Sequence, residues 1–209
     1  MSEYARSVTI AYVVVFSALA ISLTFSRAEI PFPLLPYLKF DFAEIPVMLA
    51  LLLGGLAPGL ATAVIHWIGL SMARGWVLGP LMKFLAVAPM VVGFWLGIKI
   101  WKIKSLQKSM VLAFPLGAIF RVMVCAIANT IVFLFVAPDF LKFSVGYLKA
   151  IGLNVSSEID ALLWTLAFNA IFNVLHVILS AAIAVVIFIA AIKRIPGIAG
   201  KVWLPSKTK

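Results

Sequence analysis

Apolar residues along the chain form long runs that are separated by short segments of charged and turn-forming residues. A hydrocarbon core of about 30 Å requires roughly 20 residues of α-helix. Four runs reach that length, at residues 8–26, 78–101, 110–136 and 161–192. They predict four helices that cross a membrane.

The apolar run at residues 42–72 is too long for one upright helix, and it has Gly54-Gly55 and Pro58-Gly59 at its middle. Pairs of glycine and proline favour turns. We therefore predict two short helices, at residues 42–56 and 58–72, joined by a turn that is buried among other helices. The whole pattern predicts a single all-α integral membrane domain over residues 1–209. It is a six-transmembrane-helix bundle whose second and third helices are short.

Composition supports a membrane protein. The chain is 65% hydrophobic and only 11% charged, with a mean hydropathy of +1.18, so the lipid bilayer must act as its solvent. A net charge of +10 would suit nucleic acid in a soluble chain, but here most of the cations lie beside apolar runs. We therefore exclude nucleic acid as a partner. We expect the first run to be retained as a helix and not removed as a signal peptide.

The basic residues predict the orientation of the chain. Excess Lys and Arg marks cytoplasmic segments. Arg6 agrees with a cytoplasmic N-terminus, which gives a multi-pass protein of the cell membrane with its N- and C-termini cytoplasmic. An alternative with one tilted helix at residues 42–72 places the N-terminus outside and fits the charges equally well, so the glycine and proline pairs alone favour six helices. The cytoplasmic segments are those that contain Lys99, Lys102, Lys104 and Lys108, and Lys193, Arg194, Lys201, Lys207 and Lys209.

Several polar side chains fall inside the predicted helices, where they are costly and usually face a bundle interior or a cavity. They lie at helical spacing, so each group shares one face of its helix. Asparagines in such positions also serve as hydrogen bonds between helices, a lysine near a helix end can extend to the interface, and a buried cysteine often only packs. The residues are Lys83, then Arg121, Cys125 and Asn129, and then Asn169, Asn173 and His176.

Arg121 poses the sharpest question among these residues. The predicted spans contain no acidic residue except Glu44, which lies at a helix mouth. A buried arginine requires compensation. Backbone carbonyls, a lipid phosphate, a partner subunit and an anionic group of a ligand all remain open as partners, and the role of His176 is open as well.

The segment at residues 31–46 differs from the rest of the chain because it combines prolines, aromatic rings and charges. Proline restricts its own φ and the conformation of the preceding residue, so we expect a stiff, non-helical bridge. A solvated rim and an interfacial aromatic belt are the alternatives to a preformed lid over a flat, partly apolar ligand. We favour the lid, with contacts from Tyr37, Lys39, Phe40, Asp41 and Glu44.

Motifs of several function classes are missing from the sequence. It has no GxxxxGK[ST] phosphate loop, no HExxH pair and no GxSxG elbow. With a single cysteine and two separated histidines we expect neither an enzyme nor a metal site. A secondary transporter would show related halves and coupling carboxylates, which we do not find. A substrate-capturing membrane subunit that is powered by other proteins remains.

The string FPLLPYLKFDFAEIP at residues 32–46, followed by an apolar helix and the two glycine-containing turns, resembles the S components of energy-coupling factor (ECF) vitamin transporters. The segments GPLMKFLA at residues 79–86 and FNAIFNVLH at residues 168–176 resemble the riboflavin-specific members. The resemblance implies a six-helix subunit that captures a vitamin from outside without a cofactor of its own. It also implies that the loaded subunit docks onto a membrane T component that carries two cytoplasmic ATPases.

The resemblance also suggests roles for single residues. Asn129 and Asn169 match positions where riboflavin-type members place asparagines that hydrogen-bond the ligand, whereas Phe172 stands where they tend to carry a lysine. We expect Lys83 to supply that donor instead. Small residues four apart on the first helix dock the T component in this family, which here implies Ala18 and Ser22.

The expected ligand is riboflavin. Another vitamin or a phosphorylated flavin is the alternative, because an anionic group would fit Lys83 and Arg121 if they are unpaired. A structural or assembly subunit of a membrane complex is the alternative from another class. The expected substrate-binding residues are Tyr37, Lys39, Phe40, Asp41, Glu44, Lys83, Asn129, Asn169 and Asn173.

Overall fold

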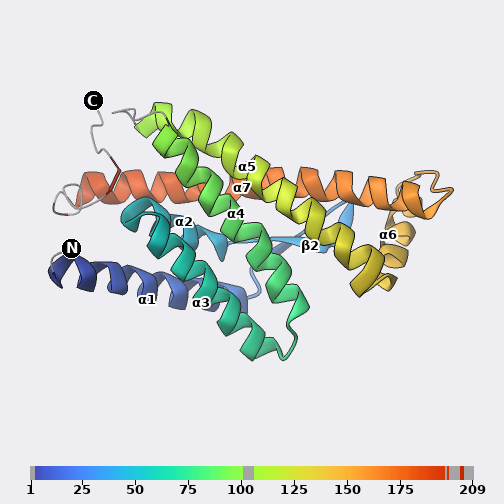
Figure 1. The fold of residues 1–209 in the computed structure, drawn as a ribbon, viewed down its shortest axis with the longest axis horizontal. Helices are drawn as coiled ribbons and strands as arrows, with labels where there is room; N and C mark the ends of the chain where they lie inside the picture. Colours follow the sequence, from blue (N-terminus) through green and yellow to red (C-terminus); the bar gives the residue numbers. More distant parts are fainter. Residues whose placement is uncertain (1–2, 101–105, 196, 198–202, 205–209) are drawn as a thin grey trace.

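The computed structural model describes residues 3–100, 106–195, 197 and 203–204. Trp101, Lys102, Lys104, Lys201, Lys207 and Lys209, which entered the predicted helix ends and the orientation, lie outside the described residues. In chain order the elements are α1 (Glu3–Phe25), β1 (Glu29–Phe32), β2 (Leu35–Asp41), α2 (Glu44–Gly54), α3 (Leu56–Arg74), α4 (Leu78–Ile100), α5 (Leu106–Ile131), the π-helix η1 (Val132–Val136), α6 (Asp139–Ala150) and α7 (Glu158–Arg194) (Figure 1).

The described helices confirm an apolar helical fold. Five helical stretches are long and apolar enough to cross a membrane, namely Arg6–Phe25, Leu56–Arg74, Leu78–Ile100, Lys108–Val136 and Glu158–Arg194. At 11 residues, α2 is shorter than a membrane-crossing helix. The number of six crossings therefore stays a prediction, although α2 and α3 do divide the long apolar run.

Glycine determines where α2 and α3 separate. Gly55 has φ +92°, a conformation that side chains with a Cβ rarely adopt, and α3 begins at the next residue. The Leu51 carbonyl accepts hydrogen bonds from the Gly55 amide at 2.8 Å and from Trp203 Nε1 at 2.6 Å. Leu204 is buried beside this bend, at 3% exposure. The elbow is therefore closed by the C-terminal part of the chain.

The proline-rich bridge forms an antiparallel hairpin of β1 and β2, which the sequence did not reveal. Glu29 pairs with Asp41 and Pro31 with Lys39, and the register becomes irregular after Pro31. Two-stranded hairpins tolerate proline because their outer edges need no ladder bonds. Phe32 and Leu35 are buried at 4% and 0% exposure, so one side of the hairpin packs on the helices.

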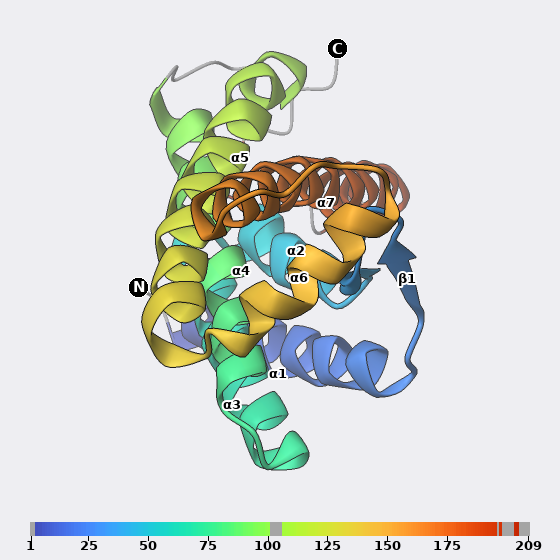
Figure 2. The ribbon, with the colours of Figure 1, turned by 90° about the vertical axis from the view of Figure 1, so that its right-hand side faces the viewer.

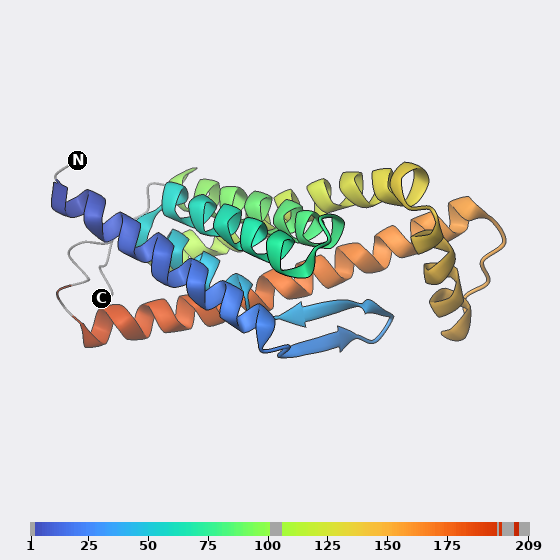
Figure 3. The same ribbon diagram turned by 90° about the horizontal axis from the view of Figure 1, so that it is seen from below.

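A second difference lies at residues 137–160, between two of the predicted membrane helices, where the apolar runs predict no helix. The segment contains the amphipathic helix α6, which crosses the end of the molecule in Figure 2 and in Figure 3. Leu141, Ser144 and Leu148 are buried at i, i+3 and i+7, while Phe143 on the opposite side is 66% exposed. The helix was missed because polar and glycine residues interrupt its apolar stripe.

Long α7 runs through the whole molecule, with the hairpin and α2 along one side and α5 along another (Figures 1 and 3). The beginning of α1 and the end of α7 lie at the same end of the molecule (Figure 3). The helices α4 and α5 approach very closely, because α4 carries glycine where they meet. A Cβ on Gly93 would lie 2.4 Å from the Leu116 carbonyl oxygen, and one on Gly97 would lie 2.5 Å from Ala113 Cα.

This close approach predicts that Gly97→Val destabilises the protein. The added side chain meets backbone that cannot move aside, and overpacking of this kind costs about 1–3 kcal/mol. Thermal unfolding in detergent should occur at a clearly lower temperature. Gly146→Val on α6 is the matched control, because a Cβ there meets nothing within 4 Å. Equal unfolding temperatures for the two variants would contradict the tight α4–α5 contact.

Candidate substrate-binding site

Two polar stripes that the sequence places on separate helices face each other in the structure. Asn129 Nδ2 of α5 donates to Asn169 Oδ1 of α7 at 3.3 Å. One and two turns further along α5, Cys125 Sγ and Arg121 Nε donate to Asn173 Oδ1 at 3.7 and 2.7 Å. The amide side chains therefore lie between α5 and α7, at the level where the hairpin begins to cover the bundle.

Arg121 has an acidic partner. Its Nη1 and Nη2 donate to the two carboxylate oxygens of Glu44 at 2.6 and 3.0 Å, and both residues are almost fully buried, at 2% and 1% exposure. His176 Nδ1 lies 3.2 Å from Arg121 Nη2, and Ser180 Oγ donates to Glu44 at 3.4 Å. Glu44 at the helix mouth is thus the partner of Arg121, and it is none of the four partners that the sequence analysis left open. Arg121 needs no lipid, subunit or ligand to neutralise it.

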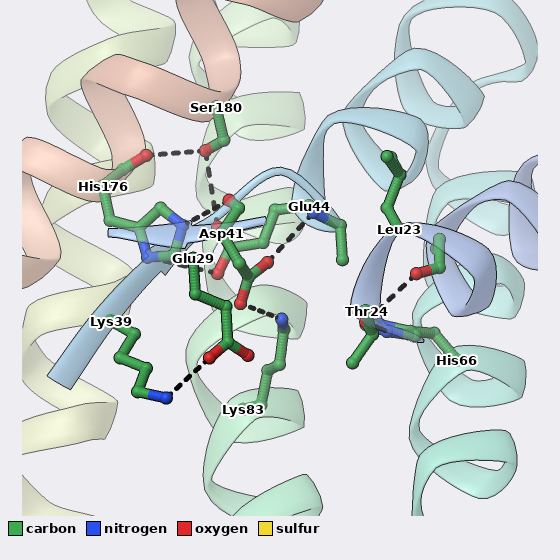
Figure 4. A network of polar contacts seen from close by, with 12 residues as sticks. Leu23, Thr24, Glu29, Lys39, Asp41, Glu44, His66, Lys83, His176 and Ser180 are labelled. Carbon is green, nitrogen blue, oxygen red and sulfur yellow. Dashed lines mark hydrogen bonds and ion pairs between the residues drawn. The ribbon is translucent and has the colours of Figure 1, made fainter. Parts of the chain in front are cut away.

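Lys83 is also paired. Its ammonium group forms an ion pair with Asp41, the last residue of β2, and both side chains are largely buried (Figure 4). Asp41 Oδ1 accepts the amide of Ala43 at 3.0 Å, and His176 Nε2 lies 3.1 Å from the Asp41 carbonyl oxygen. The premise that Lys83 and Arg121 are unpaired cations is therefore wrong. Both belong to one network that fixes the foot of the hairpin to α4, α5 and α7. The foot is the end of β2 at Asp41 together with the start of α2 at Glu44.

Further polar contacts hold the two strands of the hairpin. Lys39 Nζ donates to Glu29 Oε2 across the two strands at 2.7 Å, and Arg74 of α3 lies 3.9 Å from the same carboxylate. Tyr37 Oη lies 3.0 Å from Ser144 Oγ of α6, so the hairpin also contacts the helix that crosses the end of the molecule. Lys39, Arg74 and Tyr37 are the exposed members of this set.

Aromatic rings fill the space between the hairpin and α7. The rings of Phe40 and Phe172 are 4.7 Å apart at an interplanar angle of 36°, and Phe32 contacts both. Phe172 is 7% exposed and Leu35 is fully buried beside it. Phe172, which stands where riboflavin-type members tend to carry a lysine, therefore forms the inner wall of an apolar cluster under the hairpin.

The structure separates the predicted site residues into three groups. The hairpin foot and its network contain Asp41, Glu44, Lys83 and Asn173, the amide pair contains Asn129 and Asn169, and the outer hairpin contains Tyr37, Lys39 and Phe40. Sequence reasoning missed Phe32, Leu35 and Ser144, because only the strand alternation and the unexpected α6 bring them to the site. Ala18 and Ser22 lie on the exposed side of α1, away from all three groups. Among the described residues, no group of three His, Cys, Asp or Glu side chains is placed to hold a metal ion.

Comparisons with known proteins agree with this arrangement. No protein-family model matches the chain. The chain is 32% identical over 135 residues to "Riboflavin transporter RibU" of Staphylococcus aureus (strain TCH60), which covers 64% of this chain and 68% of that protein. The fold matches the solved structure titled "Structure and mechanism of the S component of a bacterial ECF transporter" with a TM-score of 0.64 and 23% identity, over 92% of this chain and 97% of that one.

The first match extends over more than two thirds of the relative, and the second shows the same fold over almost the entire chain. The protein is therefore a membrane-embedded transport subunit, and it belongs to the S components of ECF transporters, in the RibU-like group.

Proposed function

We propose that the protein captures riboflavin from outside the cell, in a site formed by the Asn129–Asn169 pair and the ring cluster under the hairpin. The observation that carries the proposal is that these two amides face each other, and that α7 carries Asn169 beside Phe172 of the apolar ring cluster. The relative whose printed name is riboflavin transporter supports the same ligand.

The amide pair suits the polar edge of a flavin. One side of the tricyclic flavin ring presents carbonyl acceptors around an N–H donor, and a primary amide offers one donor group and one acceptor. At 3.3 Å the bond between Asn129 and Asn169 is longer than the usual 2.9–3.0 Å of a good N–H···O bond. Exchange of this weak contact for bonds to a ligand therefore costs little.

The ring cluster suits the apolar faces of the same ligand. A flat ring held between Phe40 and Phe172 needs about 7 Å between their centroids, because stacked carbon atoms approach to about 3.5 Å. The centroids lie 4.7 Å apart. Binding between these rings therefore requires the hairpin to move away from α7, in keeping with a lid.

The remaining site residues act through the lid in this proposal. Lys83 and Asp41, together with Glu44, anchor its foot, while Tyr37 and Lys39 hold its outer part. Asn173 receives a hydrogen bond from Arg121 and donates Nδ2 to the Asn169 carbonyl at 2.8 Å. It therefore positions the part of α7 that carries Asn169.

Delivery of the vitamin requires partners in this proposal. We assign a T component and two ATPase subunits as those partners and no chemistry to the subunit itself. Ala18 and Ser22 are exposed four residues apart on α1 and leave room for close approach of another helix. Lys99, Lys193 and Arg194 lie in the last turns of α4 and α7, and this excess of basic residues supports a cytoplasmic side for that end of the molecule in the proposal.

The first prediction from the proposed function concerns ligand affinity. Riboflavin should lose its fluorescence when titrated with the purified protein, and Asn129→Leu or Asn169→Leu should weaken binding about tenfold or more, since each lost hydrogen bond corresponds to roughly 1 kcal/mol or more. Asn154→Leu is the matched control, because Asn154 lies exposed between α6 and α7. Unchanged fluorescence at micromolar concentrations would remove riboflavin as the ligand. Altered stability with unaltered affinity would favour an assembly subunit.

A second prediction concerns ligand charge. Because Lys83 and Arg121 have acidic partners, the site offers no uncompensated cation for a phosphate, and a phosphorylated flavin should bind about tenfold or more weakly than riboflavin. Competition titrations measure the difference. Asp41→Asn leaves Lys83 without its acidic partner and should reduce the difference in affinity between riboflavin and the phosphorylated flavin. Equal affinities for the two flavins in the unaltered protein would contradict the charge balance.

A third prediction concerns the buried ion pair. Arg121→Met leaves the Glu44 carboxylate without its partner and should destabilise the protein by about 3–5 kcal/mol. The double variant Arg121→Met/Glu44→Gln removes both charges and should recover much of that loss. Thermal unfolding with and without riboflavin measures both effects. A double variant that is no more stable than the single one would show that the two charges do not compensate each other.

A further inference from the structure

The outer end of the molecule contains an open cavity of about 390 Å³. Its walls come from η1, α6, the segment after α6 and the first turn of α7. The volume falls within the roughly 300–1,000 Å³ of small-molecule sites. None of the nine predicted substrate-binding residues lines it.

The walls combine an apolar floor with a polar rim. Phe133, Leu141 and Val145 line the inner part, and the rim carries Ser156 and Glu158 together with neighbouring polar groups. The shape follows from the π-helix. The Ala137 amide bonds the Val132 carbonyl five residues back at 2.8 Å, which widens the last turn above α5. Single π-turns of this kind often mark functional sites.

The cavity lies directly above the amide pair along both helices. From α5 into η1, Phe133 follows Asn129 by four residues, which is about one turn and about 6 Å. On α7, Ala161 precedes Asn169 by eight residues, or about 12 Å. Thr165 stands halfway between them on the same buried face of α7.

Thr165 is one of five described residues whose buried side-chain polar atom has no hydrogen-bond partner among the described residues, and of these five it is the one on α7 between the cavity and Asn169. Its side chain is 0% exposed, and its hydroxyl makes no hydrogen bond to the residues that the structure describes. A buried hydroxyl costs free energy unless it gains a partner. A polar group of a molecule that passes from the cavity to Asn169 would supply one.

The other approach, from beneath the hairpin, is obstructed by side chains. Phe32, Leu35 and Phe172 interlock there, and the hairpin foot is held by buried ion pairs. In contrast, α6 lies between Pro138 and Gly152, and Gly152 has φ +87°. The outer side of α6 is exposed.

We propose that the cavity under α6 is an outer docking chamber for the flat ring of the ligand, and that Thr165 is a ligand contact on the path from this chamber to Asn169. The inference rests on the proposed function for the identity of the ligand. It assigns the entry route to the space between η1, α6 and α7, and not to the hairpin face.

Filling the chamber tests the route. Val145→Trp fills it from α6 and Ala161→Leu from α7, whereas Gly146→Trp adds the same ring to α6 where a Cβ meets nothing within 4 Å. Stopped-flow measurement of riboflavin fluorescence gives both rate constants. We expect both filled variants to slow association and dissociation by about tenfold with little change in Kd, because a route affects both directions equally. The control should remain within about twofold of the unaltered protein.

Unchanged association rates in both filled variants would overturn the chamber. A weakened Kd that arises from faster dissociation would also overturn it, because the cavity would then be part of the final site. Absence of any fluorescence change with the unaltered protein would instead overturn the proposed function, and the inference with it.

Thr165→Val tests the contact, because it removes the hydroxyl at nearly constant volume. The Kd for riboflavin should rise about fivefold to tenfold, while the unfolding temperature without ligand stays the same or increases, since the hydroxyl has no partner to lose. An unchanged Kd would overturn the contact. Thr130→Val is the control, because its hydroxyl on α5 already donates to the Ala126 carbonyl at 2.8 Å.

Discussion

The arrangement depends on the neutralisation of charge inside an apolar bundle. A guanidinium group cannot remain buried without a partner, and Arg121 is buried in the centre of this protein. Its partner, Glu44, is the first residue of α2. That position matters because α2 follows the hairpin directly. Neutralising one arginine of α5 therefore also determines where the hairpin emerges and which side of it faces α7.

The same constraint shapes the proposed binding site. Lys83 and Asp41 repeat the pairing closer to the outer end, and His176 links the two pairs through the Asp41 backbone and Glu44. With these charges compensated, what remains for a ligand is neutral: two amides, a buried hydroxyl and a wall of rings. Such a surface favours a flat molecule with a polar edge and disfavours an anion.

Much of the fold was predictable from the sequence, because lipid imposes strong rules on length and polarity. The apolar runs placed the long helices, Gly54-Gly55 placed the break in the run at residues 42–72, and helical spacing placed Asn129 and Asn169 on inward faces. The hairpin and α6 were not predictable. The prolines hid the strand alternation of β1 and β2, and the stripe of α6 is short and interrupted. The pairing of Arg121 with Glu44 joins residues 77 positions apart, and no local pattern encodes such a contact.

The contacts of the hairpin differ in strength along its length, and this difference suggests how it moves. The pair Lys39–Glu29, with the lysine side chain 51% exposed, contributes about 1 kcal/mol or less. The pairs at the foot are buried, and breaking them exposes an uncompensated charge to an apolar surrounding. The strands between the foot and the turn are held by apolar contacts of Phe32 and Leu35, which can shift without leaving a charge unpaired. Tyr37 contacts Ser144, so movement of these strands also affects α6. In the proposed function the strands therefore shift to make room for the bound ring, while the foot and the helices that hold the amides stay in place.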